Sequence, residues 1–348
     1  MRLRRRSFVT TLAAATTPAL FACTGKGGSG PSHSPPPPSP VPDCVELSPQ
    51  HLRAANDPCA GQDDTGADGD VQQLEWFGPI STHDDVAVAW YRNLLIEWSL
   101  ADGAARRALA PRRASGRAYA LVGGAVVTPT CDGSLAIHRD GCLSGTIKPD
   151  AALAQLCGLD EASFLTLGTE GTLLRLDLEG KVLARADVPT SPGATFIAVD
   201  TATGVVSIST ATTALLVDAS TLELRERLDS LPASRAGWLP TSDGQLAGLG
   251  EALYRHDVAS GSTETFEAHS KAVLAVGPKG TMAAIQGVDW TVLPRGADPE
   301  VVRVARGVST HPHAAIAADG TVIALDALRG MTSVDPGTGD RNFTFDTP

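Results

Sequence analysis

The residues best suited to chemistry in this 348-residue chain form an acidic run. Asp64, Asp68, Asp70 and Glu75 match positions 1, 5, 7 and 12 of a calcium-binding loop, with Gly69 at position 6. Position 3 holds a glycine, which has no side-chain oxygen, and prolines and glycines on both sides exclude flanking helices. The pattern therefore favours a solvated acidic connector, with a calcium site as the alternative.

Two histidines form the second candidate site. His311 and His313 stand at the start of the last strand-rich segment. Metal binding or general-base chemistry at this pair is conceivable, but a metal centre needs three or four converging ligands. The sequence does not bring His269 or His83 near the pair as a third ligand, so a polar loop is the favoured interpretation. His138 and His256 lie inside expected strands, where we expect half-buried or exposed side chains.

Five arginines lie within twelve residues of an otherwise acidic chain. Such a cluster can bind anionic lipid headgroups or an acidic partner. We favour instead an outer edge strand and its loop, kept soluble by charge. The five residues are Arg106, Arg107, Arg112, Arg113 and Arg117.

The cysteines fit an oxidising compartment. Cys44 and Cys59 lie before the main body, and a bridge between them would close a small loop that nothing else stabilises, so we favour this pair. Cys131 and Cys142 flank an expected strand of six residues, about 20 Å long at ~3.3 Å per residue. A disulfide needs Cα atoms within roughly 7 Å, so we expect these two cysteines to be unbonded. The state of Cys157 stays open.

The known catalytic signatures are missing from the chain. There is no G-x-S-x-G, no G-x-x-x-x-G-K-[ST] and no H-E-x-x-H. No Cys-x-x-Cys pair occurs either, which argues against a structural zinc site. We therefore expect no cofactor, apart from the calcium alternative.

Composition restricts the fold and the partners. Hydrophobic residues make up 43% of the chain and charged residues 19%, which excludes wholesale disorder. The 35 glycines and 24 prolines favour many turns and few long helices, hence a β architecture. The formal charge of -11 argues against nucleic acid as a partner.

Residues 1–22 have the pattern of a removable export signal, with basic residues before a short apolar stretch. Arg5, Arg6 and Phe8 resemble the twin-arginine export motif. Residues 20–23 resemble a bacterial lipobox, which implies that Cys23 is lipidated; Phe21 departs from the small residue usual there, and a cleaved, soluble exported protein is the alternative. The Gly/Pro-rich residues 23–43 then predict a disordered tether, followed by an irregular segment over 44–70.

Residues 71–348 read as a repeat of short strands separated by Gly-containing turns. The unit is clearest at 196–199, 205–210, 214–224 and 225–229, which predict four strands. Seven such units at a mean spacing near forty residues predict an all-β, seven-bladed β-propeller of four-stranded antiparallel blades. The units span 74–110, 118–147, 152–188, 196–229, 237–268, 272–305 and 314–345.

The repeat resembles bacterial β-propellers of the quinoprotein-like and YVTN/NHL-like, WD-repeat-like groups. Residues 198–204 (AVDTATG) and 334–339 (VDPGTG) resemble their VDxxTG signature, and residues 312–320 (PHAAIAADG) resemble PxxIAxxxDG. These signatures specify hairpins, not chemistry. Several exported lipoproteins of this kind are docking platforms, so the resemblance implies such a role.

We therefore expect a non-enzymatic binding or scaffold module in a bacterial cell envelope. The lipid anchor would hold it to a membrane, in the periplasm or at the cell surface, with an envelope protein as partner. The competing hypothesis is a metal-dependent, lactonase-like propeller enzyme, whose scattered single ligands at the axial mouth leave no motif.

Overall fold

The computed structural model describes much of the chain from residue 77 onward. Residues 1–76 lie outside the described part, so the export signal, Cys23, the Cys44–Cys59 pair and the acidic run stay predictions. The described residues are 77–83, 86–91, 94–101, 105–109, 119–130, 133–139, 142–150, 153–189, 195–241, 244–269, 271–277, 280–294, 300–308, 313–317, 319–326, 330–334 and 341–345.

The described residues form antiparallel sheets built from strands that are consecutive in the chain. The first four sheets contain β1 (Phe77–His83), β2 (Val86–Tyr91), β3 (Leu94–Ser99) and β4 (Ala105–Leu109); β5 (Ala120–Val122), β6 (Ala125–Pro129), β7 (Leu135–Arg139) and β8 (Cys142–Ile147); β9 (Leu153–Gly158), β10 (Ser163–Gly168), β11 (Thr172–Asp177) and β12 (Val182–Asp187); and β13 (Phe196–Asp200), β14 (Val205–Ser209), β15 (Ala214–Asp218) and β16 (Leu224–Leu228).

The remaining sheets follow in the same way. They contain β17 (Trp238–Pro240), β18 (Gln245–Leu249), β19 (Leu253–Asp257) and β20 (Thr263–Phe266); β21 (Val273–Val276), β22 (Met282–Leu293) and β23 (Glu300–Val308); and β24 (His313–Ile316), β25 (Val322–Asp326), β26 (Gly330–Val334) and β27 (Arg341–Phe345).

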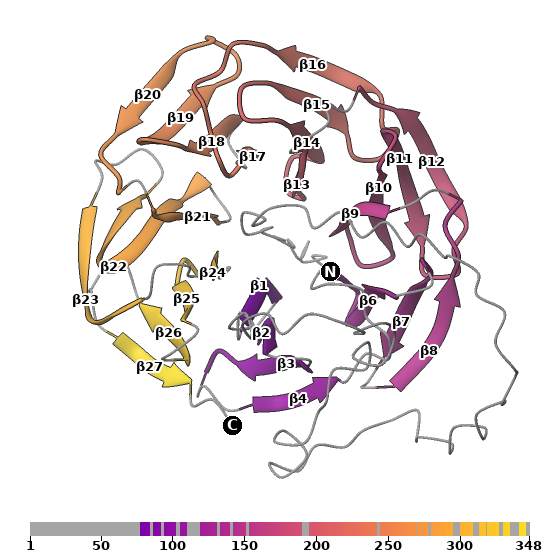
Figure 1. The fold of residues 1–348 in the computed structure, drawn as a ribbon, viewed down its shortest axis with the longest axis horizontal. Helices are drawn as coiled ribbons and strands as arrows, with labels where there is room; N and C mark the ends of the chain where they lie inside the picture. Colours follow the sequence, from indigo (N-terminus) through magenta and orange to yellow (C-terminus); the bar gives the residue numbers. More distant parts are fainter. Residues whose placement is uncertain are drawn as a thin grey trace, which may run out of the picture.

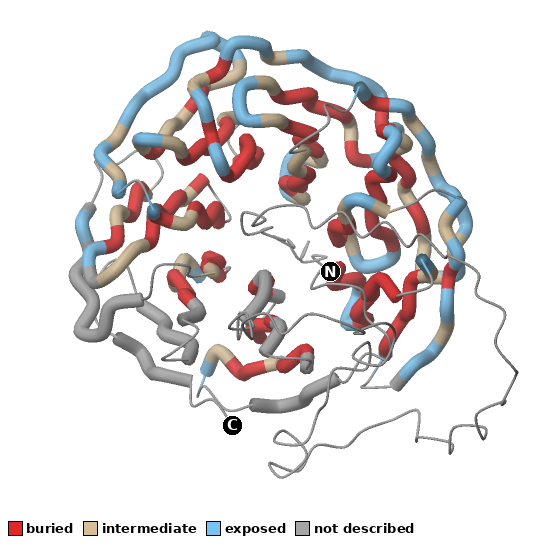
Figure 2. The backbone as a smooth tube through the Cα atoms, in the orientation of Figure 1, coloured by how far each residue is buried: buried red, intermediate tan, exposed pale blue. Residues whose placement is uncertain are grey.

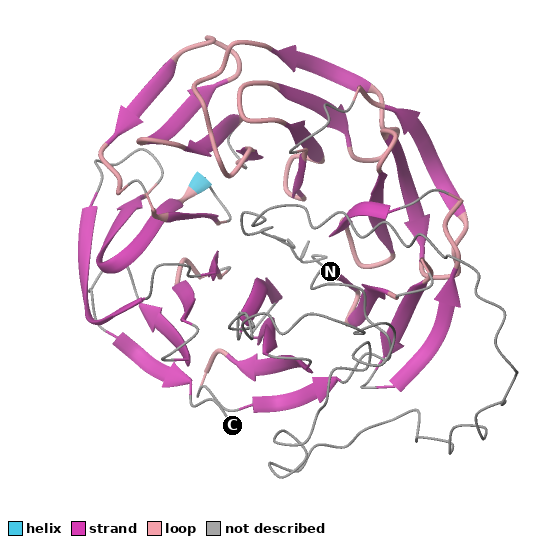
Figure 3. Ribbon diagram, viewed as in Figure 1, coloured by secondary structure: helices cyan, strands magenta, loops and turns pink. Residues whose placement is uncertain are grey.

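These sheets stand around a common axis, so the fold is a β-propeller (Figure 1). The first strand of each sheet lies nearest the axis and the last strand lies on the rim, as Figure 3 also shows. Neighbouring sheets pack face to face, for example β9 against β13 and β13 against β17. The predicted all-β propeller with four-stranded antiparallel blades is thereby confirmed.

The number of four-stranded blades is six, whereas the repeat count predicted seven. The difference lies in the sheet of β21, β22 and β23, where the expected second and third strands are joined in the twelve-residue β22. Its first half pairs with β21 and its second half with β23. Gly287 lies between the halves with a φ of 57°, where the register also shifts.

Burial follows the position of a strand within its sheet (Figure 2). Every residue of β10 is buried, whereas the first four residues of the rim strand β16 are exposed. An inner strand is covered by the two neighbouring blades, while the blades diverge toward the rim. The alternation of apolar residues is therefore lost in the middle strands, which are buried on both faces.

The described glycines of the Asp-Gly pairs have the backbone conformation of tight turns. Gly133, Gly244 and Gly320 have φ angles of 80°, 80° and 97°, in the left-handed region that favours glycine. The carboxylate of Asp319 accepts a hydrogen bond from the Thr321 N–H at 2.9 Å and closes its turn. The carboxylate of Asp200 likewise accepts a hydrogen bond from the Ala202 N–H at 3.0 Å, so the aspartate of the VDxxTG signature stabilises a turn.

One strand boundary differs from the prediction. The third strand of the fourth sheet ends at Asp218, not at Leu224. The Asp218 carboxylate accepts hydrogen bonds from the N–H groups of Ser220 and Thr221 at 2.8 and 3.0 Å, which ends the strand and starts a turn. Leu222 in this turn has a φ of 61°, and the rim strand β16 begins two residues later.

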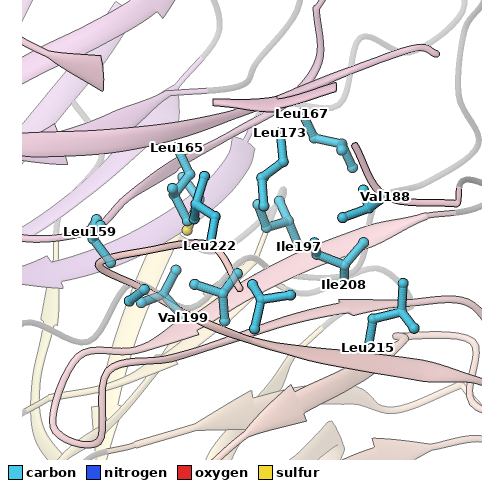
Figure 4. Packing of buried hydrophobic residues seen from close by; sticks show 14 residues of the cluster. Leu159, Leu165, Leu167, Leu173, Val188, Ile197, Val199, Ile208, Leu215 and Leu222 are labelled. Atoms are coloured by element: carbon cyan, nitrogen blue, oxygen red, sulfur yellow. The ribbon is translucent and has the colours of Figure 1, made fainter. Parts of the chain in front are cut away.

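Aliphatic side chains fill the spaces between blades. Figure 4 shows the cluster between the third and fourth sheets, where Leu165, Leu173 and Ile197 are fully buried. Because each blade has two apolar faces, it is stabilised only by packing against both neighbours. The ring is thus the cooperative unit of the fold.

Close backbone contact occurs where the second and third blades meet. A Cβ on Gly158 would lie 2.2 Å from the carbonyl oxygen of Leu121, so a side chain does not fit there. Glycine at this position allows β9 to approach β5.

The ring closes by packing of the first blade against the last, because β1 lies beside β24 (Figure 1). Thr82 on β1 donates a hydrogen bond from Oγ1 to the carbonyl oxygen of Ile316 at 3.3 Å, and both residues are buried. In the described part, neither sheet contains a strand from the other end of the chain. Closure therefore depends on side-chain packing and this bond.

Candidate functional site

The histidine pair predicted at the axial mouth is only partly within the described residues. His313 is the first residue of β24 and is partly exposed, whereas His311 lies outside the described residues. His269 is exposed in the loop after β20. Within the described ranges, no group of three or more His, Cys, Asp or Glu side chains is arranged to hold a metal ion.

His138 and His256 are buried, with 6% and 5% of their surfaces exposed, so the prediction of half-buried or exposed side chains was wrong. Both occupy the same place in their blades. Each pairs with the second residue of the second strand, Val126 for His138 and Leu246 for His256. The third and fourth blades have Leu176 and Val217 there. The two histidines thus replace aliphatic residues between blades.

The surroundings of these histidines disfavour a charged ring. Nδ1 of His256 lies 2.8 Å from the Thr263 hydroxyl, but Nε2 of both histidines is buried without a hydrogen-bond partner among the described residues. Burial lowers the pKa of both rings, and for His256 the nearby Asp257 and Glu226 oppose this shift. These histidines belong to the core rather than to a ligand site.

Cys157 is a buried free thiol on the inner strand β9. Burial raises its pKa to about 12, which keeps it protonated. It lies in the aliphatic cluster between the third and fourth blades, so it behaves as a small apolar residue. The sequence left its state open.

The strand order predicted around the other two cysteines of the body is present. Cys142 begins β8, and β7 lies before it. Cys131 lies outside the described residues, so its separation from Cys142 stays a prediction. Of the arginine cluster, Arg106 and Arg107 lie in β4, the rim strand of the first blade; the other three lie outside the described part.

A concave site lies between the rims of the third and fourth blades, within the described residues. It is a hollow of about 240 Å³. Apolar side chains form most of its wall, and one carboxylate and one guanidinium complete it. The lining residues are Ala186, Asp187, Val188, Pro189, Leu215, Val217, Leu222, Leu224 and Arg227.

Small residues on β12 help to create this hollow. Ala184 and Ala186 face the aliphatic cluster between the two blades but are too short to fill the space at the rim. The opposite wall comes from β15, β16 and the turn that Asp218 forms. The Asp218 carboxylate accepts hydrogen bonds from Ser220 and forms an ion pair with Arg225 at 2.5 Å. Both contacts lower the pKa of Asp218, so a charged carboxylate holds this turn.

Exposed apolar side chains lie on the rim strands at the hollow. Among the described residues, the large hydrophobic side chains that are exposed all lie on the last strand of their sheet. Three of them, Val182, Leu183 and Leu224, lie on the two strands that flank the hollow, β12 and β16. Leu143 on β8 and Val301 on β23 are the others. Exposed apolar groups gathered beside a cavity are typical of a binding surface.

Comparison with known proteins gives no family for the chain. No family model matches it, and no curated protein matches it. Among the described residues, no helix is long and apolar enough to cross a membrane.

Sequence reasoning did not find the hollow. The nearest signal was the pair of alanines in VLARAD. That signal has meaning only when the facing strand is known. The described geometry offers an apolar side-chain cavity with flanking charges, which can accept an apolar side chain.

Proposed function

We propose that this chain is a membrane-tethered, extracytoplasmic binding or scaffold propeller without catalytic activity. The observation that carries the proposal is the rim of the third and fourth blades, where a hollow lined mainly by aliphatic residues lies between two strands that carry the exposed Val182, Leu183 and Leu224. Exposed apolar side chains gathered beside a cavity are typical of a surface that another molecule covers.

The architecture supports this proposal. We count the sheet of β21, β22 and β23 as a seventh blade, because β22 pairs with strands on both sides and so takes the place of two strands. A seven-bladed ring of the quinoprotein-like or YVTN-like kind presents a large rigid wall. Such a wall suits the docking of other proteins.

The N-terminal sequence supplies the proposed location. Arg5, Arg6 and Phe8 would direct export, and lipidation of Cys23 would fix the chain to a bacterial envelope membrane. The proline-rich part of the tether has twelve residues, which span about 37 Å as polyproline II. This length holds the propeller clear of the lipid headgroups, where its rim is accessible to an envelope protein.

The attachment is tested with the variant Cys23→Ser. The wild-type chain should sediment with membranes and be released by detergent, whereas the variant should be soluble. A wild-type chain that is soluble and indistinguishable from the variant contradicts the tether.

The non-catalytic character is tested by elemental analysis of the purified full-length chain. We expect no bound metal at a stoichiometric level. One metal ion per chain, together with hydrolysis of a lactone that stops when the metal is chelated, contradicts the proposal and supports the lactonase-like alternative.

A further inference from the structure

The rim strand β12 has a free edge beside the hollow. It is the last strand of its sheet and pairs with β11; within the described residues no strand lies on its other side. A free edge presents backbone N–H and C=O groups that an extended peptide can pair with. Val182 and Leu183 on this strand are 46% and 42% exposed, so apolar contacts are available along the same edge.

The rim strands of the next two blades, β16 and β20, are less suited to pairing, while β8 of the preceding blade has six residues without a charge but does not line the hollow. β16 carries Arg225, Glu226 and Arg227 in five residues, a charge density that protects an edge. β20 has only four residues and contains a glutamate. β12 has six residues, and its only charged members are Arg185 and Asp187.

The size of the hollow restricts what it can hold. Pockets for small molecules usually have about 300–1,000 Å³. The hollow has about 240 Å³ and is lined mainly by aliphatic residues. It is therefore too small for a typical cofactor, but it suits one large apolar side chain of a partner, the usual anchor of a protein interface.

Charged residues on opposite walls of the hollow restrict the orientation of a bound partner. Asp187 lies on the β12 side and Arg227 on the β16 side. The Arg227 side chain is 58% exposed, and its contact with Asp229 at 3.1 Å is an exposed ion pair that costs little to rearrange. A partner with a basic group near Asp187 and an acidic group near Arg227 is complementary to these walls.

We propose that the edge of β12 binds an extended segment of a partner protein as an added strand. An aliphatic side chain of that segment enters the hollow between β12 and β16, and a basic and an acidic residue of the segment flank it at Asp187 and Arg227. This inference rests on the proposed binding function and names the kind of partner that the rim accepts.

Photo-cross-linking in the native cells tests the site on the full-length chain. A benzoylphenylalanine in place of Leu224, which is 59% exposed at the hollow, should cross-link to one partner protein. The matched control carries the same group in place of Val301, which is 65% exposed on β23, and should not cross-link to that partner. Figure 1 shows β23 on the other side of the ring from β12.

The cross-linked partner segment is then synthesised as a peptide and its binding to the purified full-length chain is measured. It should contain an aliphatic residue between a basic and an acidic residue. Ala186→Leu fills the hollow and should weaken binding at least tenfold. Leu224→Ala, a change at an exposed residue that is safe for folding, should weaken binding at least threefold, while Val301→Ala should leave it unchanged.

Other results overturn the inference. These are a cross-link from Leu224 to residues 23–76 of the same chain, a cross-link to a second copy, no cross-link, or a peptide that binds Ala186→Leu as tightly as the wild type. If the Val301 position finds a partner and the Leu224 position does not, the binding function stands and only this site is wrong. If neither position nor capture of the whole chain yields a partner, the proposed function fails as well.

Discussion

Replacing His256 by leucine should make the protein more resistant to acid. His256 is 5% exposed, its Nε2 has no hydrogen-bond partner among the described residues, and the equivalent residues of two other blades are aliphatic. The ring lies edge-on to Trp238 at 6.2 Å between centroids. Leucine keeps this apolar contact and removes a buried polar atom that lacks a partner. It also removes the Nδ1 contact with the hydroxyl of Thr263, which is exposed, so we expect little change in stability at pH 7.5.

The pH dependence follows from the lowered pKa. Well above pH 6.5 the ring is neutral in both the folded and the unfolded chain, so it contributes no pH dependence there. Below pH 6.5 the unfolded chain binds a proton at His256 that the folded chain does not, because burial lowers the folded pKa. Stability is therefore lost as the pH falls, by up to about 1.4 kcal/mol per pH unit, until the folded pKa is reached. The carboxylates of Asp257 and Glu226 reduce this loss.

The assay is urea unfolding of wild type and His256→Leu at several pH values from 7.5 to 5.0. The difference in unfolding free energy should be nearly constant near pH 7.5 and then shift in favour of the variant as the pH falls through 6.5, by at most about 1 kcal/mol between pH 6.5 and 5.5. His269→Gln changes an exposed histidine and should run parallel to the wild type. A His256→Leu curve that also stays parallel to the wild type down to pH 5.0 would refute the reasoning.

Three further predictions concern the ring. Thr82→Val removes the bond to Ile316 and should lower the unfolding free energy by about 1 kcal/mol in urea titrations; an unchanged midpoint contradicts its role in closure. Gly158→Ala should cost about 3 kcal/mol because its Cβ meets backbone, whereas Gly145→Ala, which meets no atom within 4 Å, should cost less than about 1 kcal/mol; equal effects show that the close approach is unimportant. Cys157 should not react with a maleimide in the native protein at pH 7.5 but should react in urea; fast native labelling counts against its burial.

The fold was largely predictable because hairpins are local. Asp-Gly pairs and the VDxxTG signature fix turns through the φ of one glycine and the carboxylate of one aspartate, such as Gly244 and Asp200. Once the turns are placed, the short apolar runs between them are predicted as strands. The boundary near Leu222 was missed because a non-glycine residue has a positive φ there, which composition does not signal.

The packing between blades was less predictable, because it depends on residues about forty positions apart. His256 looks like a surface residue in the alternation of its own strand, and only the fourth blade buries it. The hollow likewise results from Ala186 facing Leu224 across two blades. The residues that the sequence suggested for metal chemistry lie mostly outside the described part, and His313 stands there without the three-ligand group that a metal centre requires.

The central claim, a binding module that acts on an envelope protein, is tested most directly by quantitative capture. The full-length chain carrying an affinity tag at its C-terminus is cross-linked in intact cells, extracted from the membrane fraction and purified, and the copurifying proteins are measured relative to it. The account predicts one envelope protein at near-stoichiometric amount, in repeated preparations and absent from cells that lack the tagged chain. Recovery of the chain alone, from membranes in which it is abundant, would contradict the account.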